Sequence, residues 1–185
     1  LDTSRASLCI DLAFSPDGRW LAYVWSPKAS TSIVRIADCE TGTLIDATEA
    51  LREDRSPAWD PDGKYLYFIS ARDFNPIYDA LQFDLSFPHA MRPYVATLRN
   101  DVANQFVPPP APLHRAKDDD DEDDEPDGDD GKPAKKKPAP VTIDADGLPH
   151  RILAFPVEEG NYERIAGAKG RALFSRFPVR GIKAS

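Results

Sequence analysis

The sequence predicts an all-β protein: an arc of about two and a half four-stranded antiparallel blades of a β-propeller. Three observations support this. The phrase FSPDGRWLAY at residues 14–23 recurs as WDPDGKYLYF at residues 59–68. The two copies start 45 residues apart, a spacing typical of one propeller blade. Short apolar runs alternate with turn signals, which is typical of short strands joined by tight turns.

The first repeat contains four candidate strands, SLCIDLAF, RWLAYVWS, TSIVRIAD and TLIDAT. Between the first two stand Pro16, Asp17 and Gly18. Proline presets φ for the first corner of a type I turn, aspartate suits the second corner, and glycine takes the left-handed position that follows. Gly42 fills the same role in the hairpin between the last two strands.

The second repeat begins in the same way, with RSPAW, a turn at Pro61, Asp62 and Gly63, and KYLYFISA. Its third strand, RPYVATLR, follows an excursion of about 20 residues, and GLPHRILAFPVE supplies a fourth strand. A third and more divergent copy starts at YERIAGAKGRALFSRFP.

We therefore expect three units along the chain. They are a blade at residues 1–54, a blade at 55–160 with an excursion at 72–91 and a disordered acidic insertion at 117–140, and the start of a further blade at 161–185. A β-sandwich with a chance repeat is disfavoured because the turn recurs at the same place relative to the same strand. Since propellers usually need four to eight blades to close, and the chain starts at Leu1 without methionine or an export segment, we expect an interior piece of a longer polypeptide.

The insertion at residues 117–140 has eleven acidic and five basic residues, a net charge of −6 within the chain's −8. The remainder is nearly neutral, so no nucleic-acid partner is expected. A calcium loop starting at Asp123 would need a glutamate at its twelfth position, where Ala134 stands. A docking tail for a basic partner is the second interpretation. The favoured one is a solvated, disordered surface insertion, because it contains no large apolar side chain.

The sequence assigns no catalytic, cofactor-binding or metal-binding residue. The three histidines, His89, His114 and His150, are scattered, and no Gly-x-Ser-x-Gly motif accompanies them. No His or Cys pair has metal-ligand spacing, and no glycine-rich phosphate loop is present. Cys9 and Cys39 are interpreted as reduced thiols of a cytoplasmic protein, or else as one bridge between neighbouring strands. No apolar run is long enough for a membrane span.

The excursion at residues 72–91 is rich in aromatic side chains and acids. If it turned helical, Phe74, Tyr78 and Leu81 would share one face. It is interpreted either as a cap on its own blade, as a contact surface for another domain, or as a wall of an access channel. Phe74, Tyr78, Phe83 and Arg92 are the candidate residues for substrate access or domain contact.

Two stretches carry a family resemblance. The segment DPDGKYLYFISARDFNPIYDALQFDLSFPHAMRPYVATLR resembles part of the second, larger propeller of the tricorn-type serine proteases, and RILAFPVEEGNYERIAGAKGRALFSRFPV is similar to the same family. The aromatic excursion that closes on MRPY is more specific than the Pro-Asp-Gly turn. That turn also occurs in TolB-like and prolyl-oligopeptidase-like propellers.

The resemblance implies a large cytoplasmic serine peptidase that degrades oligopeptides and forms ring-like homo-oligomers. In that family the propellers are non-catalytic, and they guide or filter peptides toward a catalytic half with a serine, a histidine and a PDZ-like module. No residue of that half has a counterpart here, so the parent protein is expected to be a peptidase while this segment lacks its catalytic residues. The alternatives are a TolB-like protein-binding propeller without enzymatic activity and the cap propeller of a prolyl-oligopeptidase-like enzyme.

Overall fold

A computed structural model describes residues 2–51, 53–73, 90–103, 106 and 138–178, and the backbone alone at 77–79 and 84–86. The first sheet has the order β1-β2-β3-β4 and is antiparallel throughout. Its strands are β1 (Ile10–Phe14), β2 (Trp20–Lys28), β3 (Thr31–Asp38) and β4 (Leu44–Asp46). These are the four strands expected of the first repeat.

The second sheet has the order β10-β9-β6-β5, again antiparallel. Its strands are β5 (Asp54–Trp59), β6 (Tyr65–Ser70), β9 (Arg92–Thr97) and β10 (Ile152–Ala154). A short 3-10 helix, η1 (Leu148–His150), precedes β10. The third and fourth strands of this sheet are therefore separated along the chain by the segment that contains the acidic run.

Two pairs of strands complete the described structure. β11 (Asn161–Ala168) pairs with β12 (Arg171–Phe177) and begins a third blade. Within the excursion, β7 (Ile77–Asp79) pairs with β8 (Asp84–Ser86). Residue 78 is thus part of a strand, and the helical option for this segment is wrong.

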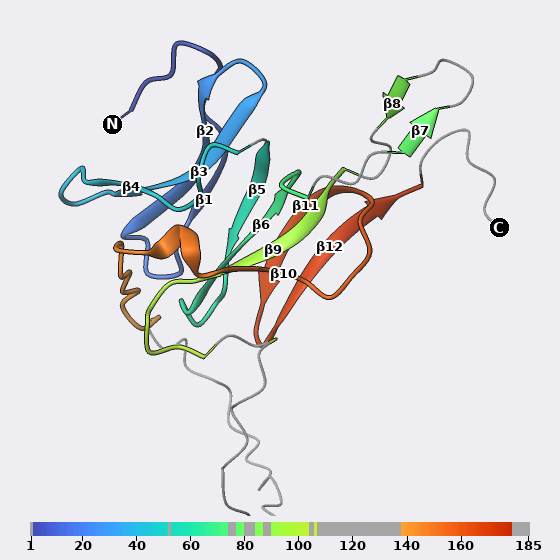
Figure 1. Ribbon diagram of the computed structural model, residues 1–185. Coiled ribbons are helices and arrows are strands. Elements are labelled where there is room, and N and C mark those ends of the chain that lie inside the picture. Colours follow the sequence, from blue (N-terminus) through green and yellow to red (C-terminus); the bar gives the residue numbers. More distant parts are fainter. Residues whose placement is uncertain are drawn as a thin grey trace, which may run out of the picture.

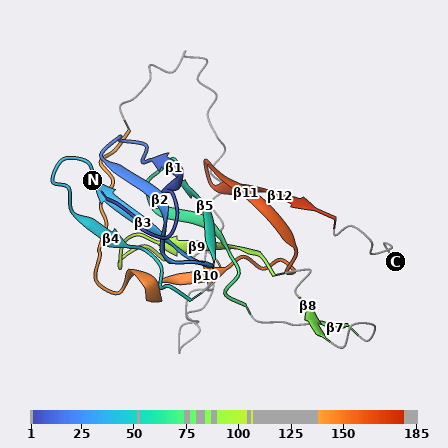
Figure 2. The same ribbon diagram turned by 90° about the horizontal axis from the view of Figure 1, so that it is seen from above.

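The three blades stand side by side, with β1, β5 and β11 next to one another (Figures 1 and 2). In each blade the strand that comes first along the chain is the inner one, and the later strands lie progressively farther out. The predicted all-β propeller arc is confirmed.

The repeated turns have the geometry expected from their sequence. Gly18 and Gly63 have φ of +77° and +68°, and Gly170 of the third copy has +68°. The Gly18 N–H donates to the carbonyl of Ser15 at 2.9 Å, and the Gly63 N–H donates to that of Asp60 at 2.9 Å. Glycine is favoured here because a Cβ is strained at positive φ.

The core lies between the blades. The cluster between the first two blades contains alternate residues of the facing strands, with Leu98 directly after β9: Trp20, Ala22, Val34, Ile36, Trp59, Leu66, Phe68, Tyr94, Ala96 and Leu98. The Trp59 indole N–H donates to the carbonyl of Ala13, 2.9 Å away, so this ring also ties β5 to β1. Burial at this joint depends on both blades, as expected where one blade cannot cover its own faces.

A second cluster joins the second and third blades. Its buried members are Tyr65, Tyr67, Ile69, Ala71, Met91, Val95, Tyr162 and Ile165. Phe155 lies at its edge, with ring centroids 5.0 Å from Phe106 and 5.9 Å from Phe174. The third blade is therefore held on the second mainly by aromatic packing.

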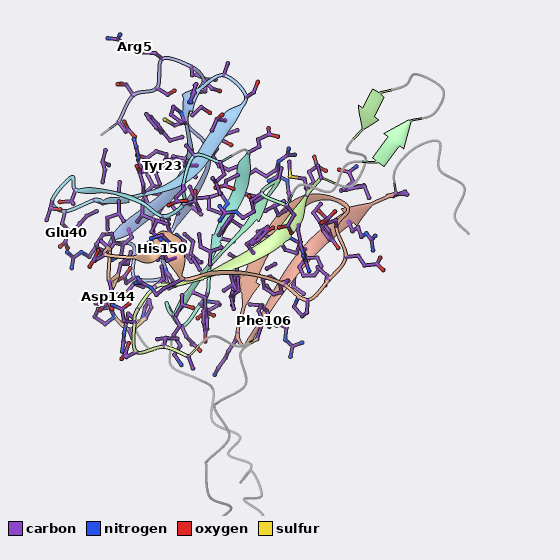
Figure 3. The ribbon with its side chains drawn as sticks, viewed as in Figure 1. Arg5, Tyr23, Glu40, Phe106, Asp144 and His150 are labelled. Carbon is purple, nitrogen blue, oxygen red and sulfur yellow. The ribbon has the colours of Figure 1, made fainter. Side chains whose placement is uncertain are left out.

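Large apolar side chains remain exposed at both ends of the arc. On the first blade, Leu12 and Phe14 of β1 are 64% and 63% exposed. On the third blade, Leu173 and Phe177 of β12 are exposed. Asp2 lies over part of the first face, where its carboxylate accepts from the Tyr23 hydroxyl at 2.8 Å (Figure 3 labels Tyr23). Sheet faces with exposed apolar side chains are expected at the ends of an open arc of blades.

The segment that follows the acidic run is anchored between the hairpin turns. The Val141 N–H donates to the Asp17 carboxylate at 2.6 Å, and the Trp20 indole N–H donates to the Val141 carbonyl at 3.0 Å. Burial alone would raise the pKa of Asp17, but hydrogen bonds from the Ser15 hydroxyl and the Val141 N–H outweigh it, so the pKa lies below its ordinary value. Asp17 therefore has a structural role beyond its turn.

Replacing Gly63 with alanine is expected to destabilise the β5–β6 hairpin more than the same change at Gly18. Both glycines have positive φ, so the backbone strain is matched. An alanine Cβ at Gly63 would lie 2.7 Å from Val141 Cγ2, whereas nothing lies within 4 Å of a Cβ at Gly18. We expect a loss of about 2–4 kcal/mol for Gly63→Ala and about 1 kcal/mol for Gly18→Ala. Hydrogen exchange of the hairpin amides measures both, and equal losses would contradict the contact with Val141.

Candidate functional site

A cavity of about 560 Å³ opens where the inner strands of the three blades begin. It is lined by the first residues of β1 and β5, the middle of β11, the end of β2 and the start of β3. The acidic side chains at its wall are Asp11, Glu53, Asp54 and Glu163, and the basic ones are Lys28, Arg55 and Arg164. The wall is thus polar, carries both charges and is shared by three blades.

Each inner strand has a β-bulge at this cavity. The pairing of β1 with β2 shifts between Ile10 and Ala13, and the same shift occurs in β5 and in β11. The bulged residues Asp11 and Ser56 have φ of +55° and +52°, and Ser30 in the β2–β3 turn has +62°. All three line the cavity. Positive φ is strained for such residues, and strain of this kind concentrates at binding and catalytic sites.

The bulges also link the blades. Asp11 Oδ2 accepts a hydrogen bond from the Ser56 N–H at 2.8 Å, and Ser56 Oγ accepts one from the Ile165 N–H at 3.2 Å. Ser32 Oγ of the first blade donates to the Asp54 carbonyl at 2.7 Å and accepts from the Asp54 N–H at 2.9 Å. The wall is therefore fixed by contacts that cross from one blade to the next.

A buried ion pair stands behind the wall. Asp54 is only 3% exposed, and Arg72 donates to its two carboxylate oxygens at 3.3 and 3.2 Å. Burial raises the pKa of the Asp54 carboxyl above its ordinary value, although the Arg72 guanidinium opposes this in part. The Arg72 guanidinium lies 5.2 Å from the ring centroids of both Phe68 and Tyr94. Arg72 thus joins the cavity wall to the core where the excursion begins.

The cavity wall is polar and carries hydroxyl and charged side chains. Several serines line it, but no histidine does, and His150 is exposed on η1 (Figure 3). Among the described residues, no three His, Cys, Asp or Glu side chains are grouped so that they could hold a metal ion. The wall therefore offers hydroxyl groups, charges of both signs and backbone held at positive φ.

The predicted turn residues lie away from the cavity. Pro16, Asp17 and Gly18 follow β1, and Pro61, Asp62 and Gly63 follow β5, at the opposite ends of these strands. Their role is structural, as the hydrogen bonds of the turns indicate.

The predicted access residues are described only in part. Phe74 and Phe83 lie outside the described residues, and so do the side chain of Tyr78, His89, His114 and residues 117–137 of the acidic insertion. Arg92 is half-buried on β9, where it donates to Asp73 at 3.2 Å, and it does not line the cavity.

The sequence contains a repeated polar position that indicates the cavity wall, in addition to the turn motif. Asp11, Ser56 and Glu163 each stand seven positions before the turn glycine of their own blade. Aligning the three copies upstream of the turn would have placed these polar side chains at one equivalent position. Within the described chain, Cys9 and Cys39 are free thiols, and no helix is long and apolar enough to cross a membrane.

Comparisons with known proteins agree with this architecture. Residues 1–185 match the family model described as the tricorn protease second beta propeller domain. The chain is 30% identical over 184 residues to a tricorn protease homolog of Saccharolobus solfataricus, covering 99% of this chain and 15% of that protein. It is 35% identical over 182 residues to tricorn protease homolog 1 of Streptomyces coelicolor, covering 98% of this chain and 16% of that protein.

The fold of a solved relative is also shared. A crystal structure of the tricorn protease superposes with a TM-score of 0.72 at 22% identity, covering 97% of this chain and 16% of that one. The chain therefore spans about one sixth of the length of these relatives. The chain belongs to the tricorn protease family, in which it corresponds to part of the second β-propeller domain.

Proposed function

We propose that this chain is a non-catalytic propeller segment of a serine peptidase that degrades oligopeptides. In this proposal it guides or filters peptides on their way to a catalytic half outside the chain. The observation that carries the proposal is the cavity at the inner strands, whose wall is built jointly by three blades. A ligand that passes along the inner edge of the propeller would contact this wall.

The wall suits a peptide because it offers both charges and fixed polar groups. Lys28 and Arg164 are exposed at the wall, and Glu163 is exposed beside them. A peptide carries a terminal ammonium and a terminal carboxylate besides its side-chain charges, and charged walls select ligands through their field. Selection of this kind changes which peptides arrive without taking part in bond cleavage.

The proposal extends to the organisation of the parent protein. The partners would be the remaining blades and the catalytic half of the same polypeptide, oligopeptide substrates and further copies of the subunit in a homo-oligomer, in the cytoplasm. The proposed partners include neither a nucleic acid nor a membrane. We place the units at residues 1–54, 55–160 and 161–185. The match to the tricorn family, rather than to a TolB-like propeller, favours the peptidase over a pure binding module.

The excursion supplies a direct test of guidance. Phe74, Tyr78 and Phe83 within it, and Arg92 directly after it, remain the candidate residues for substrate access or domain contact. In the full-length protein, truncating Phe74 and Tyr78 to alanine is expected to change the length or sequence preference for long peptides, because loops on a rigid scaffold carry specificity. A short chromogenic substrate, which needs little guidance, should be cleaved at the normal rate.

Rates measured with both substrates separate the explanations. If both substrates slow equally, the excursion supports the catalytic half. If neither changes, it is a cap on its own blade, and its part in access must be dropped.

A further inference from the structure

A single hydrogen-bonded joint recurs along the inner edge of the arc. In the first blade the bulged residue is Asp11, and its carboxylate accepts the N–H of Ser56 in the second blade at 2.8 Å. In the second blade the bulged residue is Ser56, and its hydroxyl oxygen accepts the N–H of Ile165 in the third blade at 3.2 Å. Each bulge thus presents a side-chain oxygen to the inner strand of the blade that follows.

The register shift recurs in the third blade, without the positive φ of Asp11 and Ser56, and the residue at the acceptor position is exposed. The pairing of β11 with β12 shifts between Tyr162 and Ile165, as the pairings in the first two blades do at the equivalent place. Glu163 occupies the position of Asp11 and Ser56, seven residues before the turn glycine Gly170. Glu163 is exposed, and the sheets formed by the described residues include no fourth blade beyond β11 and β12.

We propose that the Glu163 carboxylate accepts a backbone N–H from the inner strand of a further blade that packs against β11 and β12. The two joints already formed indicate which N–H would donate. It belongs either to the bulged residue of the next inner strand, as in Ser56, or to the residue two positions after the bulged one, as in Ile165. The inference depends on the propeller architecture and not on the proposed guidance of peptides.

Two observations identify the occupant as a blade. The apolar side chains Leu173 and Phe177 of β12 are exposed on the third blade, as a sheet face awaiting a neighbour would be. The relatives are about six times longer than this chain, so the parent polypeptide has ample length for another blade. A glutamate reaches farther than an aspartate, and its negative charge makes the hydrogen bond to an N–H stronger than a neutral acceptor does.

The test is hydrogen exchange on the full-length protein. Glu163→Ala is expected to speed exchange of one amide in the inner strand of the following blade by about tenfold or more, since a charge-assisted hydrogen bond is lost. Glu163→Gln keeps a carbonyl acceptor and is expected to restore most of the protection. Asp11→Ala is the calibration, because it removes the acceptor of the Ser56 N–H and should speed that amide.

The control is Glu49→Ala, which removes an exposed glutamate on the connection between β4 and β5 and should leave those amides unchanged. Unchanged exchange in the following blade with Glu163→Ala would overturn the proposal. A structure of the full-length protein decides it even where a variant fails to fold: a Glu163 carboxylate with no backbone N–H of the next inner strand within about 3.5 Å would also overturn it.

Discussion

A Gly167→Ala variant is expected to loosen the third blade from the second. Gly167 lies on β11 where that strand passes closest to the end of β5. An alanine Cβ there would overlap the carbonyl oxygen of Trp59 and lie 2.9 Å from its carbonyl carbon. Backbone atoms cannot rotate away, so the strands must separate. We expect a loss of about 3 kcal/mol or more in the stability of the β11–β12 unit.

The matched control is Gly170→Ala in the same hairpin. Nothing lies within 4 Å of a Cβ at Gly170, and only its positive φ opposes the change, at a cost of about 1 kcal/mol. Hydrogen exchange of Ile165 and its neighbours measures both variants. Equal effects would mean that β11 does not pack on Trp59 as described.

The second large effect is expected from Arg72→Ala. The substitution leaves the Asp54 carboxylate, 3% exposed, without its ion-pair partner, and it removes the guanidinium that packs beside Phe68 and Tyr94. Removing one partner of a buried pair costs about 3–5 kcal/mol. The control is Arg55→Ala, whose partner Glu53 is exposed at the cavity rim, and it should cost about 1 kcal/mol or less.

The effect of Arg72→Ala is also expected to depend on pH in a definite direction. Burial already raises the pKa of Asp54 in the folded protein, and the loss of Arg72 raises it further. A buried carboxyl with a raised pKa in the folded protein lowers the stability at pH values above that pKa. This loss of stability disappears as the pH falls and the carboxyl takes up a proton. The deficit should therefore be larger at about pH 8 than at about pH 5. A deficit that grew on acidification would contradict the buried position of Asp54.

The sequence predicted those features of the fold that depend on neighbouring residues. The turns at Gly18 and Gly63, the order of strands in the first two blades and the restart of the repeat at β11 all follow from local turn chemistry and short apolar runs. The helical option at residue 78 failed because spacing within a short aromatic segment does not distinguish a helix from a β-hairpin.

The cavity wall was beyond that local information. The bonds from Asp11 to Ser56 and from Ser56 to Ile165 join residues 45 and 109 positions apart, and they exist only after the blades pack. The anchoring of Val141 on Asp17 spans 124 positions. Neither hydrophobic periodicity nor secondary-structure propensity contains information about contacts between residues so far apart in the sequence. Only the equivalence of positions among the repeats could have indicated them.

We propose that this segment governs which peptides reach the active site and takes no part in cleavage. The most direct test reverses two exposed charges at the cavity, Lys28→Glu with Arg164→Glu, in the full-length protein. The control is Lys64→Glu, an exposed lysine beside the β5–β6 turn at the opposite end of that blade.

The quantity to measure is kcat/KM for long acidic peptides, long basic peptides and a short chromogenic substrate. Long acidic peptides should be cleaved about threefold to tenfold less efficiently and long basic ones more efficiently, because the wall loses two of its positive charges and becomes strongly negative. The short substrate, and every substrate with the Lys64→Glu control, should be unaffected. Equal losses for all three substrates, or no change in any of them, would contradict the account.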